Sequence, residues 1–417
     1  MTEALRPARR KNPMLRTRPS VLPPAIRSRV ALGMSAAAAE GRFELQVCGQ
    51  CTAVQYPPRE ACGRCLADDL HWREQDGRGV LLAETELAHS NDLYFRERLP
   101  WRLGLVRLDA GVSVVAHLHG AVAGAGEAVK ITAMLDRAGQ AVLFALPEKD
   151  VAHMQDDRQF REMTCDPKFR KVLITDGRSA IGQAMARAFV EAGAKLVWVG
   201  QSEPWKKFPG ADELAQLPGV SLQPLDVTNE KSVREMAAEI GGRVDILVNT
   251  ARLQRNHGIQ ARPGTESMRA QLDVNFLGLL RLAQEFGPAL RARAADGQSN
   301  AVAWVNILSI FALSNFPPQG SWSATQAAAH SLAQCLRAEM RPAGIRVVNV
   351  FPGPIDDEWN KELPPPKLTP AALAKAVITG LQRGVEDIYP GDLAGELRER
   401  WRENPKILER ELADERS

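Results

Sequence analysis

Residues 171–182 read KVLITDGRSAIG, and this stretch decides the fold of the larger part of the chain. It begins with an apolar run typical of a buried strand, continues through a turn that contains Gly177, and leads into a helix predicted over 180–192. The alternation of strand and helix then continues, with further strands predicted at 195–200, 220–224, 245–249, 301–307 and 345–351. Such alternation indicates a doubly wound parallel α/β sheet, which binds its ligand at the carboxyl ends of the strands.

The turn after the first strand has the composition of a phosphate-binding loop. Glycines in such a turn let backbone N–H groups approach a pyrophosphate, and the helix N-terminus adds partial positive charge. This turn runs from Thr175 to Gly182 and contains Gly177. Asp176 stands within it. Because two like charges about 4 Å apart cost roughly 1 to 4 kcal/mol, we expect weak dinucleotide binding unless this carboxylate points away.

The chain resembles the short-chain dehydrogenase/reductase family over residues 171–400. The family's first turn reads Thr-Gly-x-x-x-Gly-x-Gly, from which Asp176 and Ala180 depart. Other family positions are recognisable in LDVT (225–228), NTAR (249–252), VNFLG (274–278) and PGP (352–354). The resemblance implies a Rossmann fold and a set of cofactor-binding candidates. They are Thr175, Gly177, Ser179, Ile181, Gly182, Asp226, Val227, Asn249, Ala251, Pro352 and Gly353. After the second strand, GQS (200–202) favours neither NAD nor NADP.

The family's catalytic region is recognisable, but its proton-transferring residues are replaced. Asn275 and Ser309 match catalytic positions, whereas Trp322 stands at the Tyr position and Gln326 at the Lys position. An indole does not ionise usefully and a Gln amide carries no charge, so neither supplies the acid/base function that the family's reaction needs. No realignment restores them, because the chain has no Tyr between residues 95 and 388 and no Lys between 232 and 360. We therefore interpret Asn275 and Ser309 as vestigial.

Four of the six cysteines form two Cys-x-x-Cys knuckles separated by ten residues, and they are Cys48, Cys51, Cys62 and Cys65. Four converging thiolates complete a tetrahedral shell with no open position, which is the arrangement of structural zinc. Two redox-active dithiol pairs are the alternative interpretation. Cys165 and Cys335 stand alone, and we predict no function for them.

Five short strands are predicted after the cysteines, at 79–89, 102–108, 112–120, 128–135 and 141–146. Separated by Gly-containing turns, they are typical of a small antiparallel barrel. A rubredoxin-like zinc ribbon followed by such an OB-fold barrel resembles the acyl-CoA-associated zinc-ribbon/OB-fold family over 36–147. The residues that carry this resemblance are the two knuckles, YPP (56–58), GRG (77–79) and the hairpin around DAG (109–111). The resemblance implies a module that binds an acyl-CoA or docks beside a thiolase-like partner and performs no chemistry itself.

Charge is unevenly distributed along the 417 residues. Residues 1–30 carry eight basic residues against one acid, so the remainder of a chain with net charge +3 sums to −4. An OB-fold that binds single-stranded nucleic acid needs a basic groove with interleaved aromatics. Residues 72–147 carry eight Lys/Arg against nine Asp/Glu, so the sequence disfavours nucleic acid as a partner. The absence of any apolar run of about 18 residues disfavours a membrane span.

Five segments are predicted in chain order: a flexible basic arm (1–35), the zinc ribbon and OB-fold (36–147), a linker (148–170), the Rossmann domain (171–400) and a helical tail (401–417). The Arg-rich arm also fits a mitochondrial targeting segment, which its five prolines disfavour. The clustered cysteines favour a reducing cytoplasm. An apolar stripe over 396–412 suggests a docking helix. The stretch 354–370 corresponds to the mobile substrate lid of the dehydrogenase family.

Three hypotheses follow for the function. The first is a non-catalytic adaptor of acyl-CoA metabolism, in which the zinc-ribbon/OB module carries an inactive dehydrogenase-like domain. The second is an active NAD(P)-dependent oxidoreductase of a hydroxy- or keto-acyl-CoA, and the third is a nucleic-acid-binding protein. We expect structural zinc, weak or absent NAD(P) binding, a thiolase-like or dehydrogenase protein as partner, acyl-CoA as ligand, and a homo- or hetero-oligomer.

Overall fold

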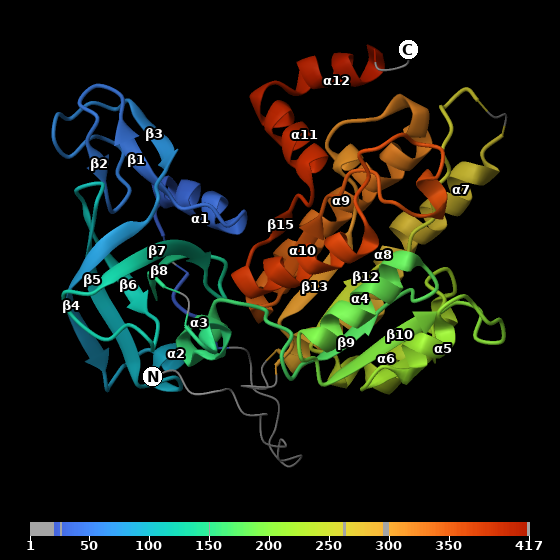
Figure 1. Cartoon of the computed structure of the whole chain (residues 1–417), viewed down its shortest axis with the longest axis horizontal. Helices are drawn as coiled ribbons and strands as arrows, with labels where there is room; N and C mark the ends of the chain where they lie inside the picture. The colour runs from blue at the N-terminus through green and yellow to red at the C-terminus, as the bar shows by residue number, and fades with distance from the viewer. Residues whose placement is uncertain (1–20, 26, 150, 262–263, 295–299, 415–417) are drawn as a thin grey trace. The chain divides into compact units, whose positions relative to one another are not determined.

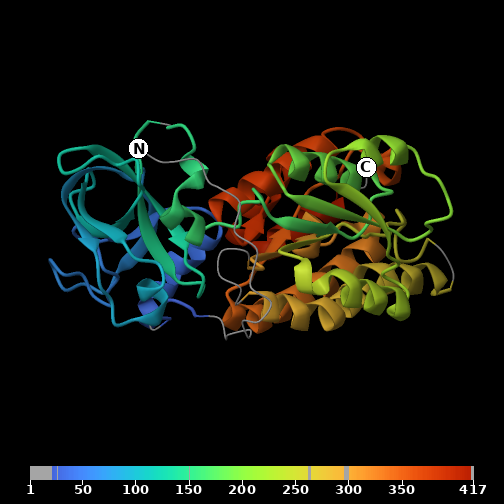
Figure 2. The ribbon, with the colours of Figure 1, turned by 90° about the horizontal axis from the view of Figure 1, so that it is seen from below.

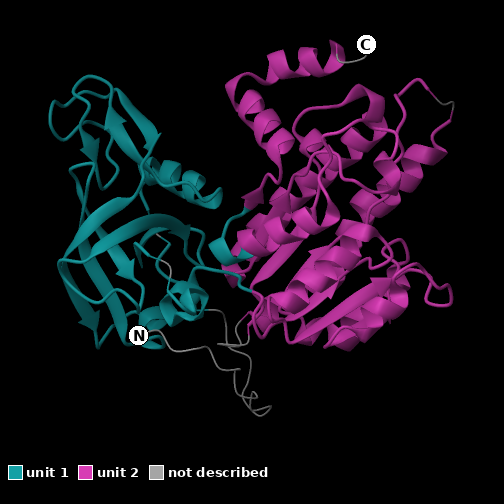
Figure 3. Ribbon diagram, in the orientation of Figure 1, with its two compact units in different colours: residues 1–7, 21–166, 381–386 teal, residues 8–20, 167–380, 387–417 magenta. Residues whose placement is uncertain are grey.

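The computed structural model describes residues 21–25, 27–149, 151–261, 264–294 and 300–414, so most of the predicted basic arm lies outside the described residues. The chain divides into two compact units (Figure 3). In the described part of the chain, unit 1 holds Val21–Asp166 with Leu381–Glu386, and unit 2 holds Pro167–Gly380 and the residues from Asp387 onward. No helix in this part of the chain is long and apolar enough to cross a membrane.

Unit 1 contains, near its start, a 3-10 turn η1 (Arg29–Ala31), helix α1 (Leu32–Ala39) and a small antiparallel sheet. In this sheet β1 (Glu44–Cys48) lies between β2 (Val54–Gln55) and β3 (Leu70–Glu74). Met34 of α1 is buried in the hydrophobic core of the unit. The predicted arm over 1–35 therefore includes the first residues of a packed helix.

Five strands form a closed barrel in the order β4-β5-β6-β8-β7 (Figure 1). They are β4 (Arg78–Leu87), β5 (Trp101–Leu108), β6 (Ser113–Leu118), β7 (Ala128–Leu135) and β8 (Ala141–Pro147). Neighbouring strands are antiparallel except β6 and β8, which pair in parallel at His117 and Leu118 and so close the barrel. Alternate side chains point inward, and Leu81, Val106 and Ile131 are buried there. The predicted zinc ribbon and OB-fold are confirmed.

The segment predicted as a linker, 148–170, is folded over much of its length. It contains the short helices η2 (Met154–Asp156) and α3 (Arg158–Glu162), which belong to unit 1. Phe160 and Met163 are buried in one cluster with Trp101 and Phe144 of the barrel strands. The sequence did not reveal this because two apolar side chains one helical turn apart are outnumbered by polar neighbours.

Unit 2 is built on a seven-stranded parallel sheet in the order β11-β10-β9-β12-β13-β14-β15. The strands are β9 (Lys171–Ile174), β10 (Leu196–Gln201), β11 (Val220–Pro224), β12 (Ile246–Asn249), β13 (Ala303–Ile307), β14 (Arg346–Val350) and β15 (Asp387–Ile388). The strand order reverses between β9 and β12, which is the switch point where such sheets bind ligands. Figure 2 shows helices on both sides of the sheet, as predicted for a doubly wound fold.

The helices of unit 2 follow the strands in turn. They are α4 (Ala180–Glu191), α5 (Ala211–Gln216), α6 (Glu230–Ile240), α7 (Glu266–Leu272), α8 (Gly278–Arg293), α9 (Gly320–Met340) and α10 (Pro370–Arg383). A π-helical turn, η4 (Asp273–Leu277), joins α7 to α8. Val233 of α6, Phe286 of α8 and Leu336 of α9 share one hydrophobic core.

Two further helices, α11 (Asp392–Glu403) and α12 (Pro405–Asp414), follow β15. The predicted boundary between the Rossmann domain and the tail, after residue 400, falls inside α11. Leu397, Leu408 and Leu412 are buried in the core of unit 2. The apolar stripe that was predicted to form a docking helix therefore packs, through these leucines, on its own unit.

Candidate functional site

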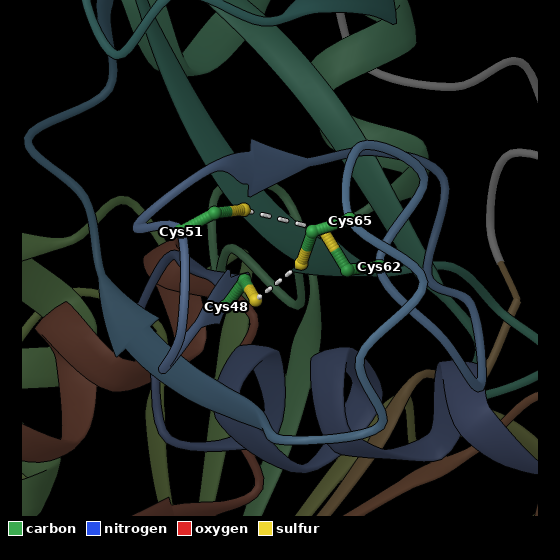
Figure 4. Close-up of side chains that lie close together, drawn as sticks. All are labelled: Cys48, Cys51, Cys62 and Cys65. Carbon is green, nitrogen blue, oxygen red and sulfur yellow. Dashed lines mark hydrogen bonds between the residues drawn. The ribbon is translucent and has the colours of Figure 1, made fainter.

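The four clustered cysteines bring their sulfur atoms together in unit 1 (Figure 4). The Sγ atoms of Cys48 and Cys65 are 3.6 Å apart, as are those of Cys51 and Cys62, and all four lie within 4.8 Å of one another. Zn–S bonds of about 2.3 Å in a tetrahedron place the sulfurs about 3.8 Å apart. The four thiols therefore fit a structural zinc ion, and their soft ligand set favours zinc over hard cations.

The backbone of both knuckles turns the cysteines inward in the same way. Thr52 and Leu66, each directly after the second cysteine of its knuckle, adopt left-handed φ angles of 58° and 64°. The backbone N–H groups of Cys65 and Arg64 lower the pKa of Cys62 to about 6. Since zinc binds the thiolate rather than the thiol, these N–H groups favour the ligating form.

In unit 2 the glycine-containing turn lies between β9 and α4, at the switch point of the sheet. A Cβ atom on Gly182 would lie 1.7 Å from the carbonyl oxygen of Asp176, and one on Gly177 would lie 2.1 Å from a methyl group of Val199. These positions therefore require glycine for close packing of helix, turn and strand. Ser179 caps the N-terminus of α4, where its hydroxyl accepts a hydrogen bond from the N–H of Gly182 at 3.2 Å, and Ile181 is buried.

Thr175 joins the ends of β9 and β12. Its hydroxyl donates to Oδ1 of Asn249 at 2.9 Å and accepts from the N–H groups of Thr250 and Ala251 at 3.0 and 3.1 Å. The hydrogen-bonding capacity of this hydroxyl, one donated and two accepted bonds, is thus fully used within the protein. Asn249 and Ala251, both predicted to contact a cofactor, are held in place at the sheet edge by this contact.

Asp176 folds back onto its own turn. Its carboxylate accepts a hydrogen bond from the N–H of Arg178 at 3.0 Å. Burial raises the pKa of Asp176, while the N–H of Arg178 opposes that shift. A backbone donor that a phosphate-binding turn would offer to an anion is therefore already occupied by a side chain of the same turn.

Two more predicted cofactor residues follow β11. The Asp226 carboxylate accepts from the backbone N–H and the hydroxyl of Thr228, at 2.9 and 2.7 Å, and so stabilises its own turn. Val227 is buried in the core of the unit. A Cβ on Gly278, the first residue of α8, would lie 3.0 Å from a Val227 methyl group, which explains the small residue there.

The residues predicted as a vestigial catalytic set come together at the start of α9. Asn275 sits in the π-helical turn η4, where its amide donates to the carbonyl of Leu253 at 2.8 Å and to the Thr325 hydroxyl at 3.0 Å. Ser309 follows β13 and accepts from the N–H of Phe311 at 3.3 Å. These bonds hold the loop after β12 against α9.

Trp322 and Gln326 lie one helical turn apart on α9, and both are buried. Oε1 of Gln326 is buried without a hydrogen-bond partner. The Arg252 guanidinium lies 5.6 Å from the centre of the Trp322 ring, within cation–π range. The two positions predicted to correspond to the family's Tyr and Lys thus hold an indole and an amide whose oxygen has no hydrogen-bond partner.

Arg252 and Asp357 form a buried ion pair that the sequence analysis did not predict. Their side chains are 5% and 6% exposed. Burial lowers the pKa of Arg252, and the Asp357 charge opposes that shift. The detectable signals were an Arg at the Gly position of the family's Asn-Asn-Ala-Gly segment and an acidic run at 356–358, but nothing in the sequence pairs them.

Asn360 anchors the loop that was predicted to be a mobile lid, beside the Arg252–Asp357 ion pair. Its side-chain amide oxygen accepts from Gln254 at 2.8 Å and from Gln319 at 3.3 Å, and its NH₂ donates to the carbonyl of Ile355 at 3.0 Å. Asn360 is 2% exposed. An isolated bridge between Ile355 and Leu368 holds the two ends of the loop together.

The space left beneath this loop is about 10 Å³. Ser309, Trp322, Pro352 and Gly353 border it, together with Arg252. A volume of about 10–15 Å³ accommodates a single water molecule. In this conformation the space between these side chains is smaller than a nicotinamide ring.

A parallel sheet of this strand order, with a glycine-containing turn at its switch point, defines a Rossmann-type fold, joined here to a zinc ribbon and an OB-fold barrel. Residues 170–367 match the family model for short chain dehydrogenase. An uncharacterized oxidoreductase of Staphylococcus aureus (strain N315) is 31% identical over 215 residues, which are 50% of this chain and 89% of the relative. The chain belongs to the short-chain dehydrogenase family.

The remaining comparisons agree with this division into domains. Residues 35–71 match the ChsH2 rubredoxin-like zinc ribbon domain, and residues 72–133 match the ChsH2 C-terminal OB-fold domain. A short chain dehydrogenase from Burkholderia cenocepacia J2315, solved in complex with NADP, is 29% identical. The match covers 59% of this chain and 98% of that one, with a TM-score of 0.54.

Proposed function

We propose that this chain is a non-catalytic adaptor of acyl-CoA metabolism. In this proposal the zinc ribbon and OB-fold of unit 1 dock a thiolase-like partner or an acyl-CoA, in the cytoplasm. Unit 2 keeps the dehydrogenase fold but performs no hydride transfer. The resemblance of unit 1 to the acyl-CoA-associated family and its match to ChsH2 domains support the choice of partner.

The observation that carries the proposal is the filled cleft. The buried pair of Arg252 and Asp357 lies over Trp322, and only about 10 Å³ remains where a reactive nicotinamide would have to lie. Opening this space requires separating two buried opposite charges, which is costly. The position of Trp322 adds to this, because general acid/base catalysis typically contributes about 10²–10⁴-fold and indole does not supply it.

An active NAD(P)-dependent oxidoreductase of a hydroxy- or keto-acyl-CoA is the second candidate. It is favoured by the relatives, which are named oxidoreductases, and by the related structure solved with NADP. Asn275 and Ser309 also remain in place. In this alternative the loop over 354–368 would have to open before each turnover.

The two candidates are separated by titrating the purified chain with NADH and NADPH, followed by turnover assays on β-ketoacyl-CoA substrates. We expect neither saturable binding nor turnover. The variant Trp322→Tyr with Gln326→Lys should also stay inactive, because Arg252 and Asp357 still fill the cleft. Robust turnover by the unmodified chain would contradict the adaptor proposal.

The docking role is tested by co-purifying the tagged full chain from its native host and assaying the eluate for thiolase activity. Cys62→Ser removes one zinc ligand and should abolish the associated activity. The matched control is Cys335→Ser, a change at an exposed lone cysteine of α9, which should retain it. Equal recovery from both variants would show that the zinc ribbon does not hold the partner.

A further inference from the structure

The four cysteines that fit a zinc ion in unit 1 differ in their exposure to solvent. Cys48 and Cys62, the first cysteines of the two knuckles, are buried. Cys51 has intermediate exposure, whereas Cys65 is exposed. A zinc ligand is a thiolate, which is also the nucleophilic form of cysteine. A reagent in solution therefore meets the Sγ atom of Cys65 before that of any other ligand.

The difference in exposure follows from where each knuckle lies relative to the sheet. The first knuckle forms the turn between β1 and β2, which pair with each other. The second knuckle lies in the segment 56–69, which contains no helix or strand. Gly63 and Arg64 are exposed beside Cys65, and the Leu66 side chain is 81% exposed. The second knuckle is thus the open side of the four-cysteine cluster.

Two glutamines of the sheet hold the second knuckle in place. The Gln46 side chain accepts a hydrogen bond from the N–H of Arg59 at 2.8 Å and donates one to the carbonyl of Arg59 at 3.0 Å. The Gln55 side chain accepts from the N–H of Gly63 at 3.0 Å and donates to the Gln46 side chain at 3.1 Å. None of these bonds involves a sulfur atom, so oxidation of a cysteine does not remove them directly.

Cys48 is the reaction partner that this arrangement offers to Cys65. Their Sγ atoms lie 3.6 Å apart across the two knuckles (Figure 4). Because a disulfide bond is about 2.05 Å long, the two sulfur atoms need to approach by roughly 1.5 Å to form one. An accessible cysteine beside a second cysteine that resolves its sulfenic acid is the arrangement of redox-sensitive sites.

We propose that Cys65 is an oxidation site, and that its reaction with a hydroperoxide releases the zinc of unit 1 through a disulfide with Cys48. The Cys65 thiolate attacks one oxygen of hydrogen peroxide, which breaks the O–O bond, forms a sulfenic acid and releases hydroxide. The Cys48 thiolate then attacks the sulfenic sulfur, which forms the S–S bond and releases a second hydroxide. One peroxide is reduced by two electrons, and each thiolate supplies one of them.

The first disulfide leaves Cys51 and Cys62 as the remaining thiolate ligands. Two ligands are fewer than the four that a structural zinc site uses, so release of the ion follows. The Sγ atoms of Cys51 and Cys62 are also 3.6 Å apart, and a second peroxide joins them by the same two steps. This proposal goes beyond the adaptor function and does not depend on it, because oxidation requires neither a partner protein nor an acyl-CoA.

The test adds hydrogen peroxide to the zinc-loaded full chain and follows zinc release with 4-(2-pyridylazo)resorcinol. Remaining thiols are then alkylated and the chain is digested with trypsin, which separates the two knuckles. Peptide 43–59 carries Cys48 and Cys51, peptide 60–64 carries Cys62, and peptide 65–73 carries Cys65. We expect release of about one zinc per chain, together with a crosslink between peptides 43–59 and 65–73 that fragmentation assigns to Cys48.

A matched pair of variants tests the role of Cys65. Cys65→His keeps a zinc ligand at the exposed position but removes its thiolate, so we expect zinc release to be at least about tenfold slower. Cys62→His changes a ligand of the same knuckle and leaves both Cys65 and Cys48, so release should stay fast and the crosslink should form. Cys335→Ser removes the other exposed cysteine and should change neither readout.

Three results would overturn the proposal. They are zinc release from Cys65→His as fast as from the unmodified chain, a first crosslink that does not join Cys65 to Cys48, and retention of zinc by the unmodified chain while Cys335 is oxidised. Peptide mapping uses the unmodified chain, so it decides the question even where a variant does not hold zinc. None of these readouts involves a partner, an acyl-CoA or hydride transfer, so failure here is separate from failure of the adaptor proposal.

Discussion

Replacing Asp357 with Asn removes the carboxylate that pairs with the buried Arg252 guanidinium and leaves only the charges of Asp176 and Glu358 to act on it. Breaking a buried ion pair from one side costs about 3–5 kcal/mol, and we expect this loss in the free energy of unfolding of unit 2. Native-state hydrogen exchange of the β13 amides measures it. Asp356→Asn is the control, because that side chain is 60% exposed and 3.5 Å from Lys367, and a change of at most about 0.5 kcal/mol is expected there. Equal losses in the free energy of unfolding of the two variants would contradict a stabilising role of the buried Arg252–Asp357 ion pair.

A single residue, His117, also makes the stability of unit 1 depend on pH. Trp101 donates its indole N–H to Nδ1 of His117 at 2.8 Å, and burial lowers the pKa of His117 from 6.5 to about 4. The unfolded chain therefore takes up the proton first. The free energy of unfolding of unit 1 is therefore unaffected by His117 above about pH 6.5. It falls by about 3 kcal/mol as the pH falls toward about 4.

Urea unfolding of unit 1 at several pH values checks this prediction. His117→Gln should remove that part of the pH slope, whereas His71→Gln, at a side chain that is 53% exposed, should leave it. Zinc release at low pH acts on all three proteins, so the difference between them isolates His117. An identical slope in all three would show that the ring is not buried in its neutral form.

Among the structural elements, the two cysteine knuckles depend most directly on a single ligand. Structural zinc contributes roughly 10–16 kcal/mol of apparent binding free energy in small zinc domains. Cys62→Ser should therefore release the metal and abolish hydrogen-exchange protection in β1 and β3, while the strands of unit 2 stay protected. Cys335→Ser should retain about one zinc per chain. A protected β1 in metal-free protein would contradict the assignment of structural zinc.

The predictability of each element followed its length and its apolar pattern. Strands β9 to β14 and helix α4 carry enough apolar residues in sequence to be predicted without any partner. The two-residue strand β15 and the five-residue helix α3 do not, because so few residues can be ordered only by the surfaces on which they pack. The loop over 354–368 is a similar case, since its polar, proline-rich sequence indicates mobility while buried Asn360 holds it closed.

At the scale of the whole molecule, two units with separate cores should unfold separately. We expect calorimetry of the full chain to show two transitions, since a chain of independent domains is not two-state. The chelator 1,10-phenanthroline should lower only the transition of unit 1, because a ligand that binds the folded form stabilises that form alone. A single transition that shifts as a whole would contradict the independence of the units.

The zinc ligands and the dehydrogenase fold were readable from the sequence, because each depends on spacing within short stretches. Cys48 to Cys65 span 18 residues, and the first strand, turn and helix of the dehydrogenase fold follow one another directly from residue 171. Only the tertiary structure decided that the cleft is filled. Arg252 and Asp357 are 105 residues apart, and several charged residues near each of them were equally plausible partners. Which charges meet, and how little space remains beneath them, depends on how the loops close over the sheet, and a local pattern does not encode that closure.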